Sequence, residues 1–229
     1  MAIVIRAHHR SAFGGLLNEA FRLRRRIFME TLGWKLPDLA GDGEREIDQF
    51  DFTPAVHHLV AVNDAGQVVG TCRLTPSDAP NVTCDVLQAQ IGAPLPRSSK
   101  IVESSRFCVD LSLSREERTA IMGDLYISHG ELAEDMGWTQ TMGVYYQSSL
   151  EALIRQGFAV DALGAPIRFA PGDPFSYPYL MTASTDGLER MMAAFGAPQG
   201  KLQDPEKDSR LLRRFREAPV RTPQLMEAR

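Results

Sequence analysis

The chain has 229 residues, enough for one well-buried domain, and its 44% hydrophobic and 24% charged residues are typical of globular proteins. A formal net charge of -4 argues against a general nucleic-acid binder. We expect no membrane span, since no run of about 18 apolar residues occurs, and no secretory signal at the N-terminus. The three cysteines and five histidines show no metal-ligand or triad spacing, so we expect reduced thiols, no metal and a cytoplasmic location.

The first half of the chain alternates between strand, helix and hairpin patterns. Apolar residues recur with the helical period in one segment, and β-branched runs bounded by turn residues mark the strands. The predicted elements are a strand at 3–5, a helix at 11–31 ended by Gly33, a loop at 34–56 with at most a short helical turn, and a hairpin of strands 58–62 and 67–74 with its turn at 63–66.

The second half follows a Pro-rich connection at 76–96. Its predicted elements are a strand at 100–111, a helix at 121–136 closed by Gly137, a strand at 139–146, a helix at 148–155 stopped by Gly157, strands at 158–169 and 175–182 joined by a turn at 170–173, and a short helix at 186–195. These elements predict an α/β (α+β) fold, a mixed sheet flanked by helices. We expect one domain over residues 1–200 and a charged, peripheral or partly disordered tail over 201–229.

Several arginines lie where burial is expected. Arg24 and Phe28 are four residues apart near the apolar stripe of the first helix, so Arg24 should point inward. Arg22, Arg25 and Arg26 share a face of that helix. Two further arginines, Arg73 and Arg106, stand in apolar strands, and a buried guanidinium requires carboxylate partners.

The carboxylates available as partners are Glu46, Asp48, Asp51 and Glu103. The first three do not form a calcium loop, because the D-x-D-x-D-G ladder with its distal glutamate is missing. A buried network of arginines and carboxylates is costly, and such networks are frequent at functional sites.

These segments resemble the signature of the acyl-homoserine lactone synthases, the LuxI-type autoinducer synthases. The matching pieces, in order, are Leu23-Arg24 with Phe28, then Leu32-Gly33-Trp34, then Glu46, Asp48 and Asp51, then Gly70 to Leu74 with Arg73, then Glu103-Ser104-Ser105-Arg106-Phe107. One departure is Val102, where a tryptophan is common in the family. The resemblance implies a GNAT-like acyltransferase fold, whose mixed sheet is splayed between two central strands to form an acyl cleft.

The resemblance also implies an activity. An acyl group would pass from an acyl-carrier-protein or acyl-CoA thioester to the amine of S-adenosylmethionine. Lactonisation would then release methylthioadenosine and yield a quorum-sensing signal. S-adenosylmethionine would be a co-substrate, and no other cofactor is expected. An acidic carrier protein needs a basic docking patch, for which Arg22, Arg25, Arg26 and Arg155 are candidates, with a second cluster at Arg210, Arg213, Arg214 and Arg216.

By the resemblance, three groups of residues have roles. The catalytic and charged group is Arg24, Asp48, Asp51, Arg73, Glu103 and Arg106. The S-adenosylmethionine group is Phe28, Trp34, Arg24, Asp48, Ser104, Ser105 and Phe107. The acyl-pocket group, on the strand at 139–146 and the helix at 148–155, is Met142, Gly143, Tyr145, Tyr146, Leu150 and Leu153. The family often has threonine at Gly143 with 3-oxo donors, so glycine favours an unsubstituted acyl chain.

Glu103 is the candidate base for the amine, and backbone N–H groups near residues 104–107 are candidate oxyanion donors. Strand alternation puts Glu103 and Arg106 on opposite faces, so a shared site predicts a β-bulge between them. Two alternatives stay open. Another GNAT-type N-acyltransferase would usually carry a glycine-rich pyrophosphate loop, which is missing near residues 111–122. A non-catalytic thioester-binding protein would have no reason to carry the charged cluster.

Overall fold

The computed structural model describes residues 1–36, 39, 41–169, 172–183 and 185–215. In chain order its elements are β1 (Ala2–Arg6), η1 (Ala7–His9), α1 (Gly14–Arg24), η2 (Arg25–Thr31), η3 (Gln49–Phe52), β2 (His57–Val62), β3 (Val68–Pro76), η4 (Thr83–Leu87), α2 (Gln88–Ile91), β4 (Ile101–Val109), α3 (Arg115–Met136), β5 (Gln140–Tyr146), α4 (Gln147–Arg155), β6 (Val160–Ala162), β7 (Ser176–Thr182), α5 (Thr185–Phe195), β8 (Leu202–Gln203) and α6 (Ser209–Arg214). None of the described helices is long and apolar enough to cross a membrane.

Most of the elements predicted from periodicity are confirmed, and two regions differ. The expected strand at 158–169 is wrong for most of its length, because only Val160–Ala162 pair in the sheet, with one isolated bridge from Ile167 to Ser176. The Pro-rich connection is not featureless, since it contains η4 and α2. The predicted turn at 170–173 begins with two residues outside the described ones.

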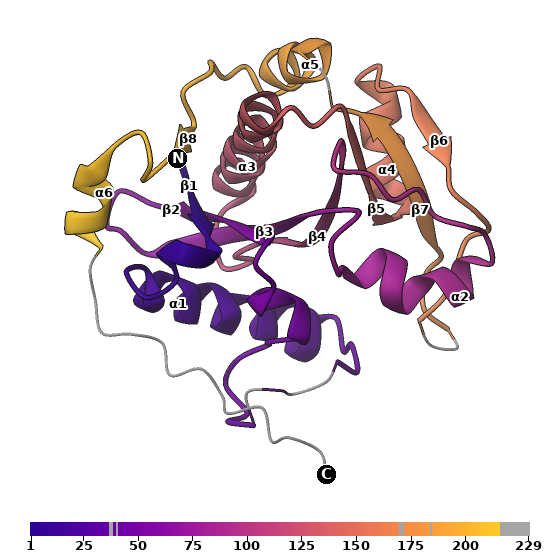
Figure 1. Ribbon diagram of the computed structural model, residues 1–229, viewed down its shortest axis with the longest axis horizontal. Helices are drawn as coiled ribbons and strands as arrows, with labels where there is room; N and C mark the ends of the chain where they lie inside the picture. Colours follow the sequence, from indigo (N-terminus) through magenta and orange to yellow (C-terminus); the bar gives the residue numbers. More distant parts are fainter. Residues whose placement is uncertain (37–38, 40, 170–171, 184, 216–229) are drawn as a thin grey trace.

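Eight strands form one mixed sheet in the order β6-β7-β5-β4-β3-β2-β1-β8. The two central strands, β4 and β5, run parallel and pair only from Ile101 opposite Gln140 to Glu103 opposite Met142. Because β4 continues to Val109 and β5 to Tyr146, the strands part beyond these three pairs. This confirms the predicted splay, and Figure 1 shows the β5–β7 part of the sheet turned away from β1–β4.

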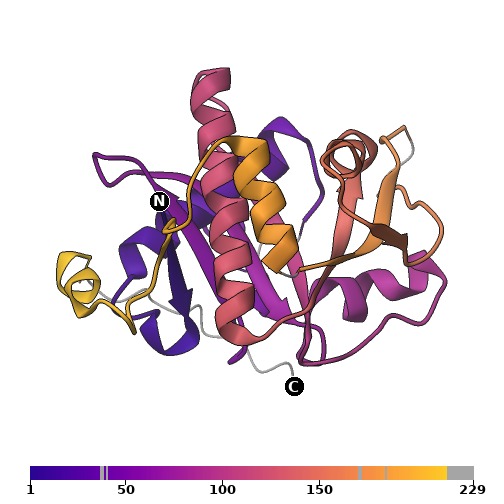
Figure 2. The same cartoon turned by 90° about the horizontal axis from the view of Figure 1, so that it is seen from above.

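Helices cover both faces of the sheet, as predicted. Figure 1 shows α3 and α1 on opposite sides of β1–β4, and Figure 2 shows α5 lying along α3. Leu125 and Leu132 of α3 pack against one face, and Leu17 and Phe21 of α1 pack against the other. The charged residues of the sequence signature therefore lie beneath α1, between a helix and the sheet.

Residues 201–215 were expected to belong to a peripheral or partly disordered tail. The structure places β8 at the edge of the sheet, parallel to β1, and Arg6 donates two hydrogen bonds to Asp204, at 2.7 and 2.9 Å. Leu211 of α6 is buried in the same apolar cluster as Phe13. This part of the chain is held because it caps an open sheet edge and covers apolar surface; residues 216–229 lie outside the described ones.

Three buried histidines predict an acid-sensitive fold. Burial lowers the pKa values of His57, His58 and His129 from 6.5 to about 4. The unfolded chain therefore takes up protons first as the pH falls below about 6.5, and the stability present above that pH is lost progressively down to about pH 4. The loss should be up to about 3 kcal/mol for each histidine. Urea unfolding between pH 8 and pH 4.5 measures it, and a His129→Asn variant should show a smaller loss.

Glu103 works in the opposite sense, because burial raises its pKa and its protonation in the folded state adds stability as the pH falls. The stability that this one carboxyl adds as the pH falls is smaller than the stability that the three histidines lose. The prediction would be contradicted if the free energy of unfolding stayed constant between pH 6.5 and pH 4.5 in both the parent protein and His129→Asn.

Candidate functional site

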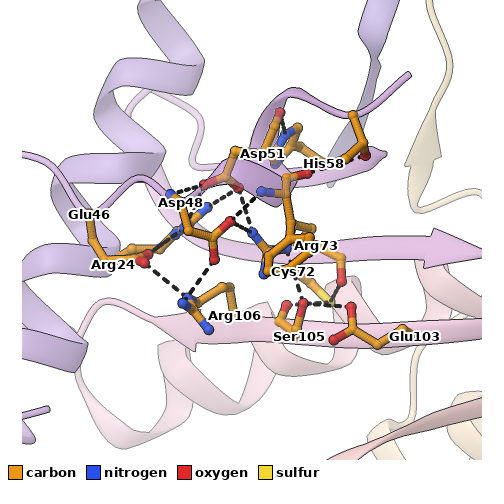
Figure 3. A network of polar contacts seen from close by, with 12 residues as sticks. Arg24, Glu46, Asp48, Asp51, His58, Cys72, Arg73, Glu103, Ser105 and Arg106 are labelled. Carbon is orange, nitrogen blue, oxygen red and sulfur yellow. Dashed lines mark hydrogen bonds and ion pairs between the residues drawn. The ribbon is translucent and has the colours of Figure 1, made fainter. Parts of the chain in front are cut away.

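Six charged side chains form a buried cluster between α1 and the sheet (Figure 3). We call it the Arg–carboxylate cluster; its members are Arg24, Glu46, Asp48, Asp51, Arg73 and Arg106. Arg24 is the last residue of α1, Arg73 and Arg106 lie in β3 and β4, and the carboxylates come from the segment around η3. Asp48 and Asp51 also cap η3, since Asp48 accepts from the N–H of Phe50 and Asp51 accepts from the N–H of Asp48, each at 2.9 Å.

Each arginine bridges two carboxylates. Arg24 donates to both oxygens of Asp51, at 2.7 and 2.9 Å, and also pairs with Glu46. Arg73 donates through Nη1 to Asp48 at 2.5 Å and to Asp51 at 3.0 Å. Arg106 donates through Nε to Glu46 at 3.1 Å and through Nη2 to Asp48 at 3.0 Å. Three arginines therefore balance three carboxylates in one closed network.

Burial and charge oppose each other inside the cluster. Burial alone would raise the pKa of Asp51, but Arg24 and Arg73 outweigh it and hold that pKa well below its usual range. Burial alone would lower the pKa of Arg24, but Asp51 and Glu46 raise it. The side chains of Asp48 and Arg106 are 8% and 9% exposed, against at most 1% for the other four. These two are therefore the most exposed members of the cluster.

One buried donor of the cluster has no partner among the described residues, namely Nη2 of Arg73. Leaving a charged donor buried and unpaired is costly. A substrate group that accepts a hydrogen bond would remove that cost. Arg73 is therefore suited to hold a carboxylate.

Glu103 lies beside the cluster and is fully buried. Its Oε1 accepts from the hydroxyl of Thr83 at 3.0 Å, and its Oε2 accepts from the hydroxyl of Ser105 at 2.9 Å. The same Ser105 hydroxyl accepts from Nε of Arg73 at 3.1 Å, which links Glu103 to the cluster. Burial raises the pKa of Glu103, with Arg73 and the two hydroxyls opposing the rise. A carboxyl with a raised pKa is suited to take up a proton.

The predicted β-bulge in β4 is confirmed. Thr71 pairs with Cys108 and Arg73 pairs with Ser105, so Cys72 of β3 faces two residues of β4, Arg106 and Phe107. Arg106 has a φ of 54°, and no other described residue except glycine has a positive φ. This left-handed conformation turns Arg106 to the same face as Ser105, where it reaches Glu46 and Asp48.

Two aromatic rings stand over the exposed side of the cluster. The helix widens to π geometry in η2, where the N–H of Leu32 reaches the carbonyl of Ile27 at 2.9 Å. The rings of Phe28 and Trp34 then stack, with centroids 4.9 Å apart and an interplanar angle of 18°. The Arg106 guanidinium lies 6.0 Å from the Phe28 ring centroid. Aromatic faces above a guanidinium and a carboxylate suit a cationic, flat ligand.

Residues 10–191 match the family model described as autoinducer synthase. The chain belongs to the autoinducer synthase family. Two relatives of known name are acyl-homoserine-lactone synthases. One, from Agrobacterium fabrum, is 32% identical over 161 residues, which are 67% of this chain and 74% of the relative. The other, from Ralstonia nicotianae, is 31% identical over 171 residues, which are 70% and 82%.

Solved structures agree with this family. BjaI, a CoA-dependent acyl-homoserine lactone synthase solved with S-adenosylmethionine and isopentyl-CoA, has a TM-score of 0.76 at 26% identity and covers 89% of this chain and 92% of its own. MesI, another CoA-dependent synthase, has a TM-score of 0.77 at 23% identity, over 88% and 98%. An acyl-CoA N-acyltransferase from Pseudomonas aeruginosa shares the fold at a TM-score of 0.51 and 16% identity, over 79% and 98%. The expected GNAT-like architecture is therefore present.

In this autoinducer synthase the six residues of the catalytic group lie together, but two of the substrate group do not. The extra residue of the bulge shifts the alternation of β4. Phe107 therefore faces α3, where its ring stacks on Tyr126 at 4.7 Å. Ser104 also faces away, with its hydroxyl 3.4 Å from the sulfur of Cys72. Both side chains therefore point away from the Arg–carboxylate cluster, and their contacts with S-adenosylmethionine stay a prediction.

The acyl-pocket group is divided between the two faces of β5, because successive side chains of a strand alternate. Tyr145, Leu150 and Leu153 lie in one apolar cluster with Tyr179. Met142 belongs to another, on the opposite face. The hydroxyl of Tyr146 accepts from Nε1 of Trp34 at 3.0 Å, so this residue borders the aromatic wall. The six residues therefore do not line one pocket.

Four aromatic side chains, two of them not predicted from the sequence, gather where β4 and β5 part. Tyr145 lies 4.6 Å from Tyr179 between ring centroids, and Tyr126 stacks on Phe107. Burial raises the pKa values of Tyr126 and Tyr145 well above 10, so both hydroxyls stay protonated. Tyr126 and Tyr179 come from helical and strand patterns that also fit plain core. They lie in the cleft only because β4 and β5 separate at this point.

Gly143 stands where β5 leaves β4, and any side chain there would collide. An added Cβ would lie 2.7 Å from the carbonyl oxygen of Ser104 and 3.2 Å from the hydroxyl of Tyr179. A Gly143→Ala variant should therefore lose about 1–3 kcal/mol of unfolding free energy, because the strands must separate further. Urea unfolding measures this loss. A variant as stable as the parent protein would mean that the strands open freely at this point.

The arginines of the expected basic docking patch all form ion pairs. All four of its arginines have acidic partners: Arg22 with Glu19, Arg25 with Glu30, Arg26 with Asp110 and Arg155 with Glu151. The pairs of Arg22 and Arg155 are local helix pairs that the sequence allows, whereas Asp110 lies 84 residues beyond Arg26 and is brought to it only by the fold. The histidines also differ from expectation in one place, where ligand atoms of His8, His9 and Glu206 lie within 4.8 Å of one another.

Proposed function

We propose that this chain transfers an acyl group from a thioester to the amine of S-adenosylmethionine and closes the lactone, releasing methylthioadenosine. The observation that carries the proposal is the Arg–carboxylate cluster, open at Asp48 and Arg106 beneath the stacked rings of Phe28 and Trp34. S-adenosylmethionine has a flat adenine ring and a cationic sulfonium, and it carries an amine and a carboxylate at its other end. The site offers a complement to each of these groups.

The polar end of the substrate would be held by the cluster. Nη2 of Arg73, which has no partner among the described residues, is suited to the carboxylate. Asp48, partly exposed, is suited to the amine. The aromatic pair would cover the adenosyl group and stabilise the sulfonium.

Glu103 would act as the base of the acylation step. The neutral amine nitrogen attacks the thioester carbonyl carbon, Glu103 takes up its proton, and the carbon–sulfur bond breaks to release the thiolate, which then takes the proton back from Glu103. Negative charge on the carbonyl oxygen needs N–H donors. Among the described strands, β4 has no partner on its β5 side beyond Glu103, and its bulge leaves an extra residue outside the ladder. Those backbone N–H groups of residues 104–107 that point to the β5 side are therefore available for this contact.

Lactonisation needs mainly positioning. A carboxylate oxygen of the substrate attacks its γ-carbon, and the bond from that carbon to the sulfonium breaks, leaving its electron pair on the sulfur of methylthioadenosine. Because the leaving group departs neutral, correct placement supplies much of the rate. No cofactor beyond this co-substrate is required, and we expect both steps to occur in the cytoplasm.

The acyl chain would enter the cleft where β4 and β5 part. The side chains of Phe107, Tyr126, Tyr145 and Tyr179 fill that region, so we propose a short acyl group. Gly143 keeps the strands close, which agrees with an unsubstituted chain. We favour acyl-CoA as donor, because the expected carrier-protein patch is ion-paired and the similar BjaI is CoA-dependent. An acyl carrier protein is the second candidate.

Mass spectrometry of the products tests the proposal. The purified protein is incubated with S-adenosylmethionine and a panel of short, long, 3-oxo and aromatic acyl groups, each as the CoA and the carrier-protein thioester. We expect an N-acyl homoserine lactone together with methylthioadenosine, from short unsubstituted acyl-CoA above all. Neither product from any member of the panel would refute the synthase function.

A further inference from the structure

We propose that Thr83 is a positioning residue for Glu103, holding the carboxylate of the base in its reactive orientation. Thr83 lies outside every segment of the family signature, at the start of η4. The inference rests on the proposed function, in which Glu103 receives the proton of the amine.

The geometry fixes the Glu103 carboxylate from two different elements. The Thr83 hydroxyl donates to Oε1 at 3.0 Å and the Ser105 hydroxyl donates to Oε2 at 2.9 Å. Thr83 is 2% exposed and Glu103 is 0% exposed, so solvent does not supply these contacts. One donor on each oxygen defines the plane of the carboxylate. Ser105 alone, on the same strand as Glu103, would leave the group free to rotate about its contact.

Thr83 is itself held firmly. Asn81 accepts from the N–H of Cys84 at 2.9 Å, and its own N–H donates to Asp85 at 2.9 Å. The Asn81 side-chain amide also donates to the carbonyls of Ser77 and Ala79. Cys84 is buried in the apolar cluster that contains Met142. The segment before η4 is thus fastened to the underside of β4 and β5, and a buried hydroxyl there needs a partner.

The bond has a chemical consequence as well as a geometric one. A hydroxyl that donates to a carboxylate favours its charged form, whereas burial favours the neutral form. The titratable groups that act on Glu103 are Arg106 of its own strand and, from neighbouring elements, Cys72 and Arg73 of β3, Cys84 of η4 and Tyr179 of β7. Of these described groups, the two arginines carry charge at neutral pH. Loss of the Thr83 hydroxyl therefore leaves Glu103 protonated up to a higher pH.

The test compares Thr83→Val with Thr83→Ser. Valine keeps the shape and removes the hydroxyl, and serine keeps the hydroxyl. In Thr83→Val the acid limb of the pH profile of kcat/KM should move up by about one pH unit. At pH values below the midpoint of this limb, kcat/KM should be about tenfold lower than in the parent protein. The KM for S-adenosylmethionine should change little, and serine should restore the parent profile. Cys84→Ala, which changes the packing of the same segment, should lower stability without moving the limb.

A second readout does not depend on acyl transfer. Infrared spectroscopy detects the C=O stretch of a protonated carboxyl, and Glu103→Gln identifies the band that belongs to Glu103. The midpoint at which this band appears should rise by about one pH unit in Thr83→Val. A Thr83→Ala variant repeats the measurement if the valine protein does not fold.

The outcomes separate this proposal from the function on which it rests. If the parent protein makes the lactone, and Thr83→Val changes neither the acid limb of kcat/KM nor the infrared midpoint of Glu103, the role of Thr83 is overturned and the function stands. A parent protein that makes no lactone, with a shifted band in Thr83→Val, would support the Thr83–Glu103 link and refute the function. Equal shifts in Thr83→Val and Cys84→Ala would reduce Thr83 to a packing residue.

Discussion

Replacing Asp51 with asparagine should lower the free energy of unfolding by about 3–5 kcal/mol. Asp51 accepts three hydrogen bonds from the guanidinium groups of Arg24 and Arg73. Asparagine has nearly the same shape but carries no charge, so both arginines would remain buried with too little negative charge beside them. Urea unfolding at pH 8, where the buried histidines are neutral, measures the loss.

The matched control is Glu151→Gln on the surface of α4. Glu151 pairs with Arg155 at 3.8 Å, and both side chains are more than half exposed. Exposed pairs of this kind contribute about 0–1 kcal/mol. If Asp51→Asn lost no more stability than this control, the Arg–carboxylate cluster would not be held by the mutual charges of its members.

The second large effect concerns activity. A Glu103→Gln variant should lose about 10²–10⁴-fold in kcat, because the amide cannot take up the amine proton. The fold should survive, since glutamine fills the same space and one oxygen still accepts a hydrogen bond from Thr83 or Ser105. Affinity for S-adenosylmethionine, measured by calorimetry, should change only a few-fold, because Glu103 does not belong to the residues proposed to hold it.

Glu116→Gln serves as control for this experiment, because Glu116 is exposed on α3. It should leave kcat unchanged. A Glu103→Gln protein that retains the parent kcat at every pH would remove Glu103 from the chemistry and point to another acceptor, with Asp48 as the nearest exposed carboxylate of the cluster.

Membership of the charged cluster could be predicted because each requirement is local. Arg24 points inward because it shares a helical face with Phe28, and a guanidinium in an apolar strand, such as that of Arg73, needs a carboxylate. The β4 bulge could be predicted in the same way, because Glu103 and Arg106 cannot share a face on a regular strand. Helices with clear apolar spacing and glycine ends, such as α3 with Gly137, were also recognisable.

The sequence was least informative where side-chain direction depends on distant pairing. The extra residue of the bulge turns Phe107 toward α3, and ordinary strand alternation turns Ser104 away from the face of Glu103. The contact between Thr83 and Glu103 joins positions 20 residues apart across an irregular segment, and no periodicity marks it. The arginines of the expected docking patch look free in the sequence, but Asp110, far along the chain, neutralises Arg26.

The sequence by itself determined most of the element types and which charged residues must meet, because helix and strand periods and the cost of burying a charge act through local pattern. The family followed from the resemblance of its motifs. Only the tertiary structure decided which face each residue of β4 and β5 presents, where the two strands part and which hydroxyl holds Glu103. These features depend on strand register, on one left-handed residue, Arg106, and on contacts between segments far apart in the chain.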